Sequence, residues 1–510
     1  MILAIIYFLI FCFLVSKLTF FKDEHLSLKL IYGIILIKVL GCFAYYWVYF
    51  IYYPGSFQSD STSTMLDAKV VYDALPDHPS DFFKIIFGFH TDFESDPLYE
   101  TYFKNIGKWG RADITSEYFL NDNRTPIRIH AIIMLFSFGN YVVHALVMLI
   151  LSFIGQFAFY KTFKSYFPKK ELLLSAIIFL APSVLFWTSG VLKEPIALCL
   201  TGLFSYSFSM LFIKRQFKIK YVIVLVFTVL FFLILKPYIL VLIGFPMILF
   251  ALVKQFQIKK VALFYVVSLI VCVSIGVLGL KLFFNKNVIK TIVIRQNDFV
   301  NLSRGGIFFV NNENYLRLEY SDTSQYKRSV NNPELFTIKP HASLMYWQLK
   351  NIKDTIYVND NTDTSLYKLL GINAPAGSAI SMERLQYTFA SFIEFIPKSF
   401  FIVLCKPFFY DSRSVLEHMA SLENLMFLLF FIVCFWFRKK NGIDTNLLWL
   451  CIIVVLTSFV LVGITTTVMG AIVRYKVPFI PYLLMIPLLY LDHTILLKIP
   501  LLNRFFRDRS

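Results

Sequence analysis

The stretch FWTSGVLKEPIAL, residues 186–198, joins two long apolar segments and places Lys193, Glu194 and Pro195 together between them. Apolar segments recur throughout the 510 residues, of which 57% are hydrophobic, 18% aromatic and only 16% charged. A soluble globular chain carries about 25% charged residues. Because roughly 20 apolar residues of helix cross a bilayer, the composition predicts a polytopic membrane protein in which Lys193 and Glu194 occupy a short turn between two spans.

Eleven apolar runs are interpreted as spans, near residues 2–16, 30–51, 141–160, 171–188, 191–213, 221–235, 237–253, 261–283, 419–437, 446–467 and 476–491. The predicted fold class is an all-α polytopic membrane protein with about 11 transmembrane helices and two long extracytoplasmic segments. The predicted parts are two N-terminal transmembrane helices (1–53), a first extracytoplasmic loop with short helices (54–130), a transmembrane bundle (131–283), a second extracytoplasmic segment with interfacial helices (284–418), and C-terminal transmembrane helices with a cytoplasmic tail (419–510).

Lysine and arginine collect in alternate short loops, which predicts the orientation of the chain. These loops contain residues 17–29, 161–170, 214–220, 254–260 and 438–440, and the tail from Lys498 is also basic. Placing them in the cytoplasm puts the N-terminus outside and the C-terminus inside a cytoplasmic membrane. The net charge of +17 therefore indicates topology, and no nucleic-acid partner is expected because the basic residues form no single face or tail.

Three short turns on the predicted outer side keep cations: the turn with Lys193 and Glu194, the turn with Lys236, and the stretch with Arg474 and Lys476. The bias that fills inner loops with cations disfavours them here, so their presence suggests a shared anionic partner. The alternative is that each lysine extends from a helix end to lipid headgroups. Glu194 precedes Pro195 at the start of a helix, so it either complements the helix dipole or takes part in a site.

The first outer segment opens with two carboxylates near the membrane. Ser59, Asp60 or Ser61 is expected to cap a helix that starts after the second span. Asp67 follows Asp60 by two helical turns and shares its face. A carboxylate beside several cations is suited to deprotonating a hydroxyl while the cations stabilise a departing phosphate. The alternative for Asp60 is a helix cap and nothing more.

The combination of an acidic residue in the first large external loop, many spans and the late external stretch GAIVRYKVPFIPY (residues 470–482) resembles the C-type membrane glycosyltransferases. PSVLFWTSGVLKEP (residues 182–195) is similar to stretches of membrane proteins encoded with bacterial surface-polysaccharide genes. The resemblance implies Asp60 as the general base, with Asp67 second, and Arg474 and Lys476 at the carrier phosphate. It also implies a polyprenyl-phosphate-linked sugar donor, a glycan or lipid acceptor, and contact with membrane lipids.

Two other functions stay open: a polysaccharide polymerase or ligase, and a flippase or exporter of lipid-linked sugars. Ser183, Trp187, Thr188 and Ser189 could line a sugar site, although Trp187 would serve equally as an interfacial anchor. Residues 285–380 mix short apolar alternation with turn formers and predict a small outer domain, followed by one or two interfacial helices. The histidines show no zinc-ligand spacing. No metal site and no cofactor are expected, with a divalent cation as the alternative.

Overall fold

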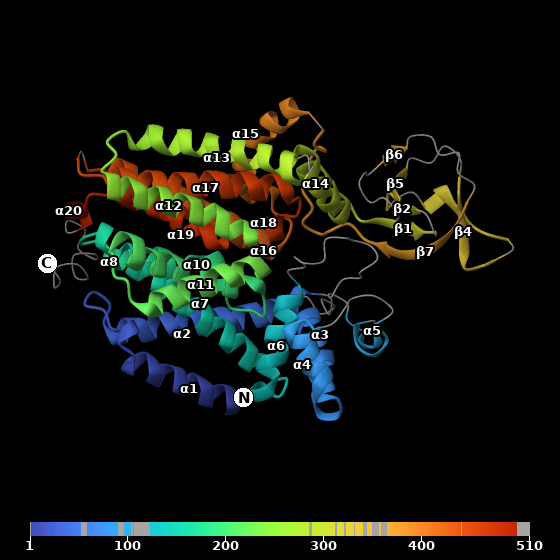
Figure 1. Ribbon diagram of the computed structural model, residues 1–510, viewed down its shortest axis with the longest axis horizontal. Coiled ribbons are helices and arrows are strands. Elements are labelled where there is room, and N and C mark those ends of the chain that lie inside the picture. The colour runs from blue at the N-terminus through green and yellow to red at the C-terminus, as the bar shows by residue number, and fades with distance from the viewer. Residues whose placement is uncertain are drawn as a thin grey trace.

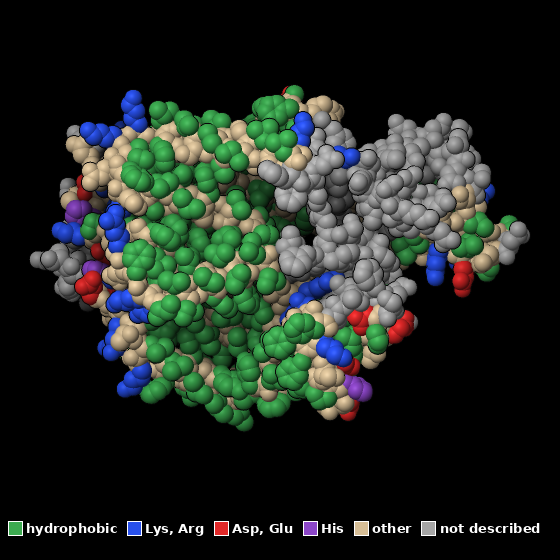
Figure 2. Space-filling model, viewed as in Figure 1, with side chains coloured by type: hydrophobic (Ala, Val, Ile, Leu, Met, Phe, Trp, Pro, Cys, Tyr) green, Lys and Arg blue, Asp and Glu red, His purple; other side chains and the backbone are tan. Residues whose placement is uncertain are grey.

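The computed structural model describes residues 2–52, 59–89, 96–103, 106, 123–284, 288–311, 314–320, 323–330, 332–339, 344–348, 356–358, 365–386, 388–439 and 441–496. A bundle of long helices carries short helices and an antiparallel sheet at one end (Figure 1). Apolar side chains cover the middle of the bundle, and many lysines and arginines gather at the end opposite the sheet (Figure 2). This distribution is typical of a protein embedded in a bilayer.

Eight helices of the described residues are long and apolar enough to cross a membrane, and two shorter apolar helices accompany them. The helical membrane-protein class is confirmed, whereas the predicted count of eleven spans is not. The eight are α2 (Leu28–Tyr46, continued by a π-helix, Trp47–Tyr52), α7 (Tyr141–Phe163), α10 (Lys193–Phe208, continued by a π-helix, Ser209–Ile213), α12 (Pro237–Phe256), α13 (Val261–Phe284), α16 (Val415–Trp436), α17 (Thr445–Thr465), and α18 (Met469–Tyr475) together with α19 (Ile480–Tyr490). The shorter two are α1 (Ile2–Lys17) and α11 (Ile219–Leu235).

Residues 171–188, predicted as one span, form two short helices, α8 (Glu171–Phe179) and α9 (Pro182–Trp187). Pro182 stands in the first turn of α9, where its missing N–H leaves no helix hydrogen bond unmade, so α8 ends before it and α9 starts at it. Residues 171–188 are therefore not one continuous helix, because the apolar length of a run does not reveal a break within it. That the two pieces together cross the bilayer stays a prediction.

Polar groups inside the bundle satisfy the backbone around this break. Gln156 Nε2 donates to the carbonyl of Ile178 (2.6 Å), and Lys38 Nζ donates to Gln156 Oε1 (2.8 Å) and to Thr188 Oγ1 (3.2 Å). An interrupted helix is stable at membrane depth only where such partners replace water. The cluster therefore holds the chain that leads from α9 into α10.

Helices α7 and α10 pack with their backbones in contact. A Cβ atom added at Gly202 would lie 1.8 Å from the carbonyl oxygen of Gly155, and one added at Gly155 would lie 2.3 Å from Cα of Cys199. Glycines allow this close approach, which lets van der Waals contacts hold membrane helices together. The position of α10, and with it Lys193 and Glu194 in its first turn, is fixed by this contact.

The described part of residues 54–137 forms helices, and the position of this segment outside the membrane stays a prediction. Its helices are α3 (Asp60–Asp77), α4 (Pro79–Phe87), α5 (Pro97–Thr101) and α6 (Arg124–Ser137). They share a core separate from that of the bundle, with Ala68, Val71, Ile85, Ile127 and Met134 among its buried residues. Most of residues 104–122 lie outside the described residues.

The second outer segment begins with α14 (Val288–Arg304) and continues into a seven-stranded sheet. The strands are β1 (Gly306–Val310), β2 (Asn314–Leu318), β3 (Tyr326–Arg328), β4 (Leu335–Ile338), β5 (Leu344–Gln348), β6 (Ile356–Val358) and β7 (Leu366–Asn373). Their order is β3-β4-β7-β1-β2-β5-β6, and all neighbouring strands are antiparallel.

The sheet follows from the short apolar alternation of this region. Ile307 and Phe309 on β1 and Leu316 and Leu318 on β2 are buried on one face, as a period of two requires. A small outer domain was predicted here, but an all-α class does not include this sheet. β1 pairs with β2, the next strand along the chain, and also with β7, which lies far from it in sequence. Local patterns do not show the second of these pairings.

Helix α15 (Phe389–Cys405) follows the sheet and packs against α17. The contact is tight, since a Cβ atom added at Gly463 would lie 2.4 Å from the carbonyl oxygen of Ser399. One or two helices were predicted in this region, and their placement at the membrane interface stays a prediction. The last described helix, α20 (His493–Leu496), lies at the end of the bundle opposite the sheet (Figure 1).

Candidate functional site

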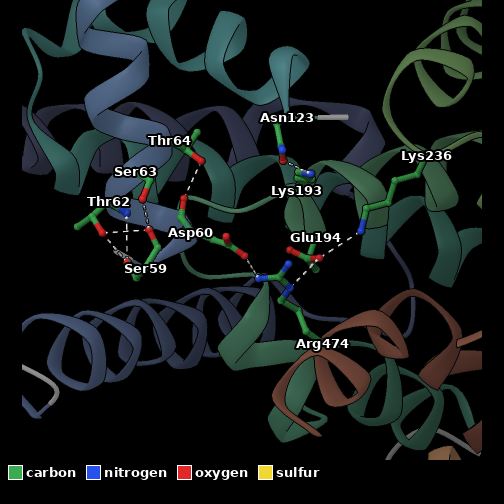
Figure 3. A network of polar contacts seen from close by, with 10 residues as sticks. All are labelled: Ser59, Asp60, Thr62, Ser63, Thr64, Asn123, Lys193, Glu194, Lys236 and Arg474. Carbon is green, nitrogen blue, oxygen red and sulfur yellow. Dashed lines mark hydrogen bonds and ion pairs between the residues drawn. The ribbon is translucent and has the colours of Figure 1, made fainter. Parts of the chain in front are cut away.

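Five of the seven candidate residues come together at the end of the bundle that carries α3 and α6 (Figure 3). Asp60 begins α3, Lys193 and Glu194 begin α10, Lys236 lies between α11 and α12, and Arg474 belongs to α18. Asp60 and Arg474, which are in contact, stand 414 residues apart in the sequence. The fold thus unites three turns whose cations were predicted to share an anionic partner.

The Asp60 side chain reaches this site because Ser59 caps α3. The Ser59 hydroxyl accepts a hydrogen bond from the N–H of Thr62 at 3.2 Å, so the capping role that was open to three residues falls to Ser59. Nη1 of Arg474 donates to Oδ2 of Asp60. The Asp60 side chain is still 47% exposed, which leaves it accessible to a ligand.

Glu194 is the buried centre of the site, with a side chain only 1% exposed. Its Oε1 atom lies 3.2 Å from Nζ of Lys236 and 3.3 Å from Nε of Arg474. Its Oε2 atom is buried and has no hydrogen-bond partner in the part of the chain that the structure describes. Glu194 also stands in the first turn of α10, where a negative charge complements the helix dipole. It therefore stabilises the helix and pairs with two cations at once.

Tyr475 lies beside the two cations that contact Glu194. Nζ of Lys236 is 5.0 Å and Cζ of Arg474 is 5.2 Å from the centre of its ring, within the range of a cation–π interaction. Burial by itself lowers the pKa of Lys236, but Tyr238 and the Glu194 carboxylate raise it more, so the pKa lies above its usual range. Lys236 consequently carries its charge at neutral pH.

Asp60, Glu194, Arg474 and Tyr475 line a pocket of about 270 Å³, named here the Arg474 pocket, and Lys236 lies behind Glu194. Lys193 projects along its wall and donates from Nζ to Oδ1 of Asn123 at 2.7 Å. Among the described side chains of the site, the cations Lys193, Lys236 and Arg474 outnumber the carboxylates Asp60 and Glu194 by one. The pocket is lined by Asp60, Thr64, Asn123, Pro126, Val191, Leu192, Lys193, Glu194, Phe299, Arg474 and Tyr475. Its charge and its hydrogen-bonding groups suit a ligand with an anionic part.

Three of the seven candidates, Lys236, Asp67 and Lys476, are not among the described residues that line the pocket. Lys236 still contacts the lining residue Glu194, whereas the other two lie away from the site. Asp67 is buried further along α3; seven residues advance a helix by about 10 Å, so a shared face does not mean a shared pocket. Lys476 is also buried, and its Nζ donates to Oδ1 of Asn424 at 3.0 Å. Residues two positions apart on a helical turn point to different sides, so Lys476 faces α16 while Arg474 faces α3.

Three other residues that line the pocket were not predicted from the sequence. Asn123 and Phe299 come from segments whose contact with the site depends on the tertiary fold. Tyr475 stood beside a named candidate, and its position between Arg474 and Lys476 was the one signal that could have drawn attention to it.

Among the described residues, no group of three histidines, cysteines, aspartates or glutamates is placed to hold a metal ion. Comparison of the chain with protein-family models, curated proteins and solved structures returned no match. The geometry of the site is therefore the basis on which a function is inferred.

Proposed function

We propose that this chain is an integral membrane glycosyltransferase, which moves a glycosyl group from a polyprenyl-phosphate or polyprenyl-diphosphate carrier to a glycan or lipid acceptor on the outer face of the cytoplasmic membrane. One observation carries the proposal: Arg474 contacts both the exposed carboxylate of Asp60 and the buried carboxylate of Glu194 in a polar pocket at the end of an apolar bundle, with Lys236 as a further cation paired to Glu194. A lipid-linked phosphate ester needs such a polar pocket beside the membrane.

The cations of the Arg474 pocket would bind the carrier phosphate. Arg474 can donate two parallel hydrogen bonds to phosphate oxygens, and Lys193 and Lys236 add positive charge. Negative charge grows on the phosphate as its bond to the sugar breaks. Cations already fixed in a partly buried pocket stabilise that charge without having to rearrange.

Asp60 is the proposed general base. Its carboxylate takes the proton of the acceptor hydroxyl while the acceptor oxygen forms a bond to the anomeric carbon of the donor sugar. The bond between that carbon and the phosphate oxygen breaks, and the phosphate leaves with the electron pair. Among the site's two carboxylates only Asp60 is substantially exposed, so it is the one that an incoming hydroxyl can reach.

Phosphate binding would also activate Asp60. Without ligand, the contact with Arg474 stabilises the charged form of Asp60 and weakens it as a base. A phosphate that engages Arg474 competes for the same guanidinium and so makes Asp60 more basic. Glu194 stays paired with Lys236, and its second oxygen can accept a hydrogen bond from a sugar hydroxyl.

The proposal is tested by rescue of a gene deletion in the chain's own host, with surface glycans followed by gel and mass spectrometry. Wild type, Asp60→Asn and Glu194→Gln are re-expressed at equal membrane levels. Asp73→Asn is the matched control, because Asp73 is an exposed carboxylate on the same helix that pairs with Lys69 outside the pocket. We expect the deletion to remove or truncate a glycan, and only wild type and the control to restore it.

Two results would contradict the proposal in different ways. Full rescue by Asp60→Asn would show that Asp60 is not the base. A deletion strain that accumulates the complete lipid-linked glycan on the inner face of the membrane, with no glycosidic bond missing from it, would indicate an exporter instead. Formation of the new glycosidic bond by the purified protein in vesicles would exclude the exporter.

A further inference from the structure

A second pocket, of about 400 Å³, lies on the other side of α18. Met469, Gly470 and Val473 of α18 line it, whereas Arg474 and Tyr475 of the same helix line the Arg474 pocket. Its remaining walls come from the π-helix after α2, from α9, from the chain around Ser378 and from the first turns of α16. It is named here the Glu423 pocket.

One wall of the Glu423 pocket is aromatic. Tyr49, Phe186 and Trp187 line it and contact one another, with 5.1 Å between the ring centres of Phe186 and Trp187 and 6.4 Å between those of Tyr49 and Trp187. Packed rings of this kind present a rigid apolar surface. Such a surface suits the C–H face of a sugar ring as well as a hydrocarbon chain.

The pocket also holds polar groups that a hydrocarbon chain would not satisfy. Glu423 is buried, with 2% of its surface exposed, and its Oε1 accepts a hydrogen bond from the N–H of Ser183 at 2.8 Å. The Ser183 side chain is itself more than nine-tenths buried, and its hydroxyl makes no hydrogen bond of normal geometry within the described part of the chain. The Ser183 hydroxyl lies beside the Glu423 carboxylate, and two buried polar groups of this kind favour a ligand that supplies hydroxyl groups over a purely apolar one.

We propose that the Glu423 pocket binds a neutral sugar residue of the acceptor glycan. The ring would stack on Trp187 and Phe186, and its hydroxyls would donate to the Glu423 carboxylate and pair with the Ser183 hydroxyl. A site that holds buried hydrogen-bonding groups discriminates against ligands that lack their partners. The role as acceptor site rests on the proposed function, whereas the binding of sugar does not.

Protection of single cysteines from a neutral maleimide tests this proposal in the full-length protein in lipid nanodiscs. The seven native cysteines are free in the structure and are first replaced by serine or alanine. Ser378→Cys then reports on the Glu423 pocket and Thr64→Cys on the Arg474 pocket. The probes are the methyl glycosides of glucose, galactose, mannose and N-acetylglucosamine, farnesol as an isoprenoid alcohol, and inorganic pyrophosphate.

We expect at least one glycoside to slow labelling at Ser378→Cys and not at Thr64→Cys. Adding Glu423→Gln should weaken this protection about tenfold, the effect of one lost charge-assisted hydrogen bond. Ser183→Ala should weaken it too, and serves where Glu423→Gln fails to fold. Protection by farnesol alone, absence of protection by every glycoside, or protection unchanged in both variants would overturn the proposal.

The same experiment separates this inference from the proposed function. Pyrophosphate should slow labelling at Thr64→Cys, because the Arg474 pocket is proposed to bind phosphate. If glycosides protect Ser378→Cys while pyrophosphate leaves Thr64→Cys unprotected, the sugar pocket stands and the transferase proposal loses its phosphate site. The reverse result would leave the phosphate site and remove the sugar pocket.

Discussion

Glu194 and its two cations form a buried charge network in which each member depends on the others. Lys236 is 5% exposed and Arg474 15% exposed at the side chain, and both lie within 3.3 Å of the same carboxylate oxygen. Removal of one partner from a buried pair leaves the others desolvated without compensation. Asp60 differs because water reaches it, so its contribution to stability and its contribution to chemistry can be measured separately.

Glu194→Gln is expected to destabilise the protein by about 3–5 kcal/mol, the usual cost of leaving buried charges unpaired. Asp60→Asn should cost about 1 kcal/mol or less, because a half-exposed ion pair contributes little, while glycosyl transfer should fall about 100-fold or more with the loss of the base. Thermal unfolding in detergent and initial transfer rates measure the two effects. Equal destabilisation by both variants would contradict the burial difference.

Arg474→Lys is expected to fold poorly and to lose most transfer activity, although it keeps the charge. A lysine ammonium is a single donor group on a flexible stem and cannot span Asp60 and Glu194 as a planar guanidinium does. Melting temperature and transfer rate are compared with those of Lys193→Arg, the reverse exchange of a lysine for an arginine in the same pocket. Wild-type activity in Arg474→Lys would show that charge alone is needed at this position.

At the scale of elements, the contact between α7 and α10 sets the place of the first turn of α10. Gly202→Ala is expected to force the helices apart and to move Lys193 and Glu194, because the new methyl group would meet the Gly155 carbonyl at 1.8 Å. We expect a lower melting temperature and reduced transfer, measured on purified protein.

The matched control is Gly276→Ala in α13, where an added Cβ meets no atom within 4 Å. Alanine favours helix over glycine by about 1 kcal/mol, so this control should be neutral or slightly stabilising. Equal losses in both variants would mean that helix propensity, and not the packing of α7 on α10, explains the effect.

The sequence predicted the elements better than it predicted their contacts. Charge in short turns between apolar runs drew attention to Lys193, Lys236 and Arg474, since charged residues are rare enough near spans to stand out, and the fold brings these three together. Nothing local showed that Asn123 joins them, that Asp67 lies along α3 away from the pocket, or that Lys476 turns toward α16. Each of these facts depends on how helices distant in sequence pack, which residue types and spacing do not specify.

At the scale of the whole molecule, the two ends of the bundle differ in charge and in content. Many lysines and arginines gather at one end, and the sheet and helices α3 to α6 lie at the other (Figures 1 and 2). The Arg474 pocket, which Asp60 and Thr64 of α3 line, is at the sheet end. Cytoplasmic loops are enriched in lysine and arginine. The proposed reaction with a lipid-linked donor on the outer face therefore requires the sheet end to face outward.

This sidedness is tested with single cysteines and a membrane-impermeant maleimide in intact cells. Val330→Cys, at a fully exposed position (100%) beyond β3 in the sheet region, should react without permeabilisation. Lys259→Cys, at an exposed position between α12 and α13, should react only after the membrane is opened. The reverse pattern would place the Arg474 pocket on the cytoplasmic side. That result would contradict a reaction with a lipid-linked donor on the outer face of the membrane. Because both positions are exposed, a difference in labelling reports the membrane barrier and not local burial.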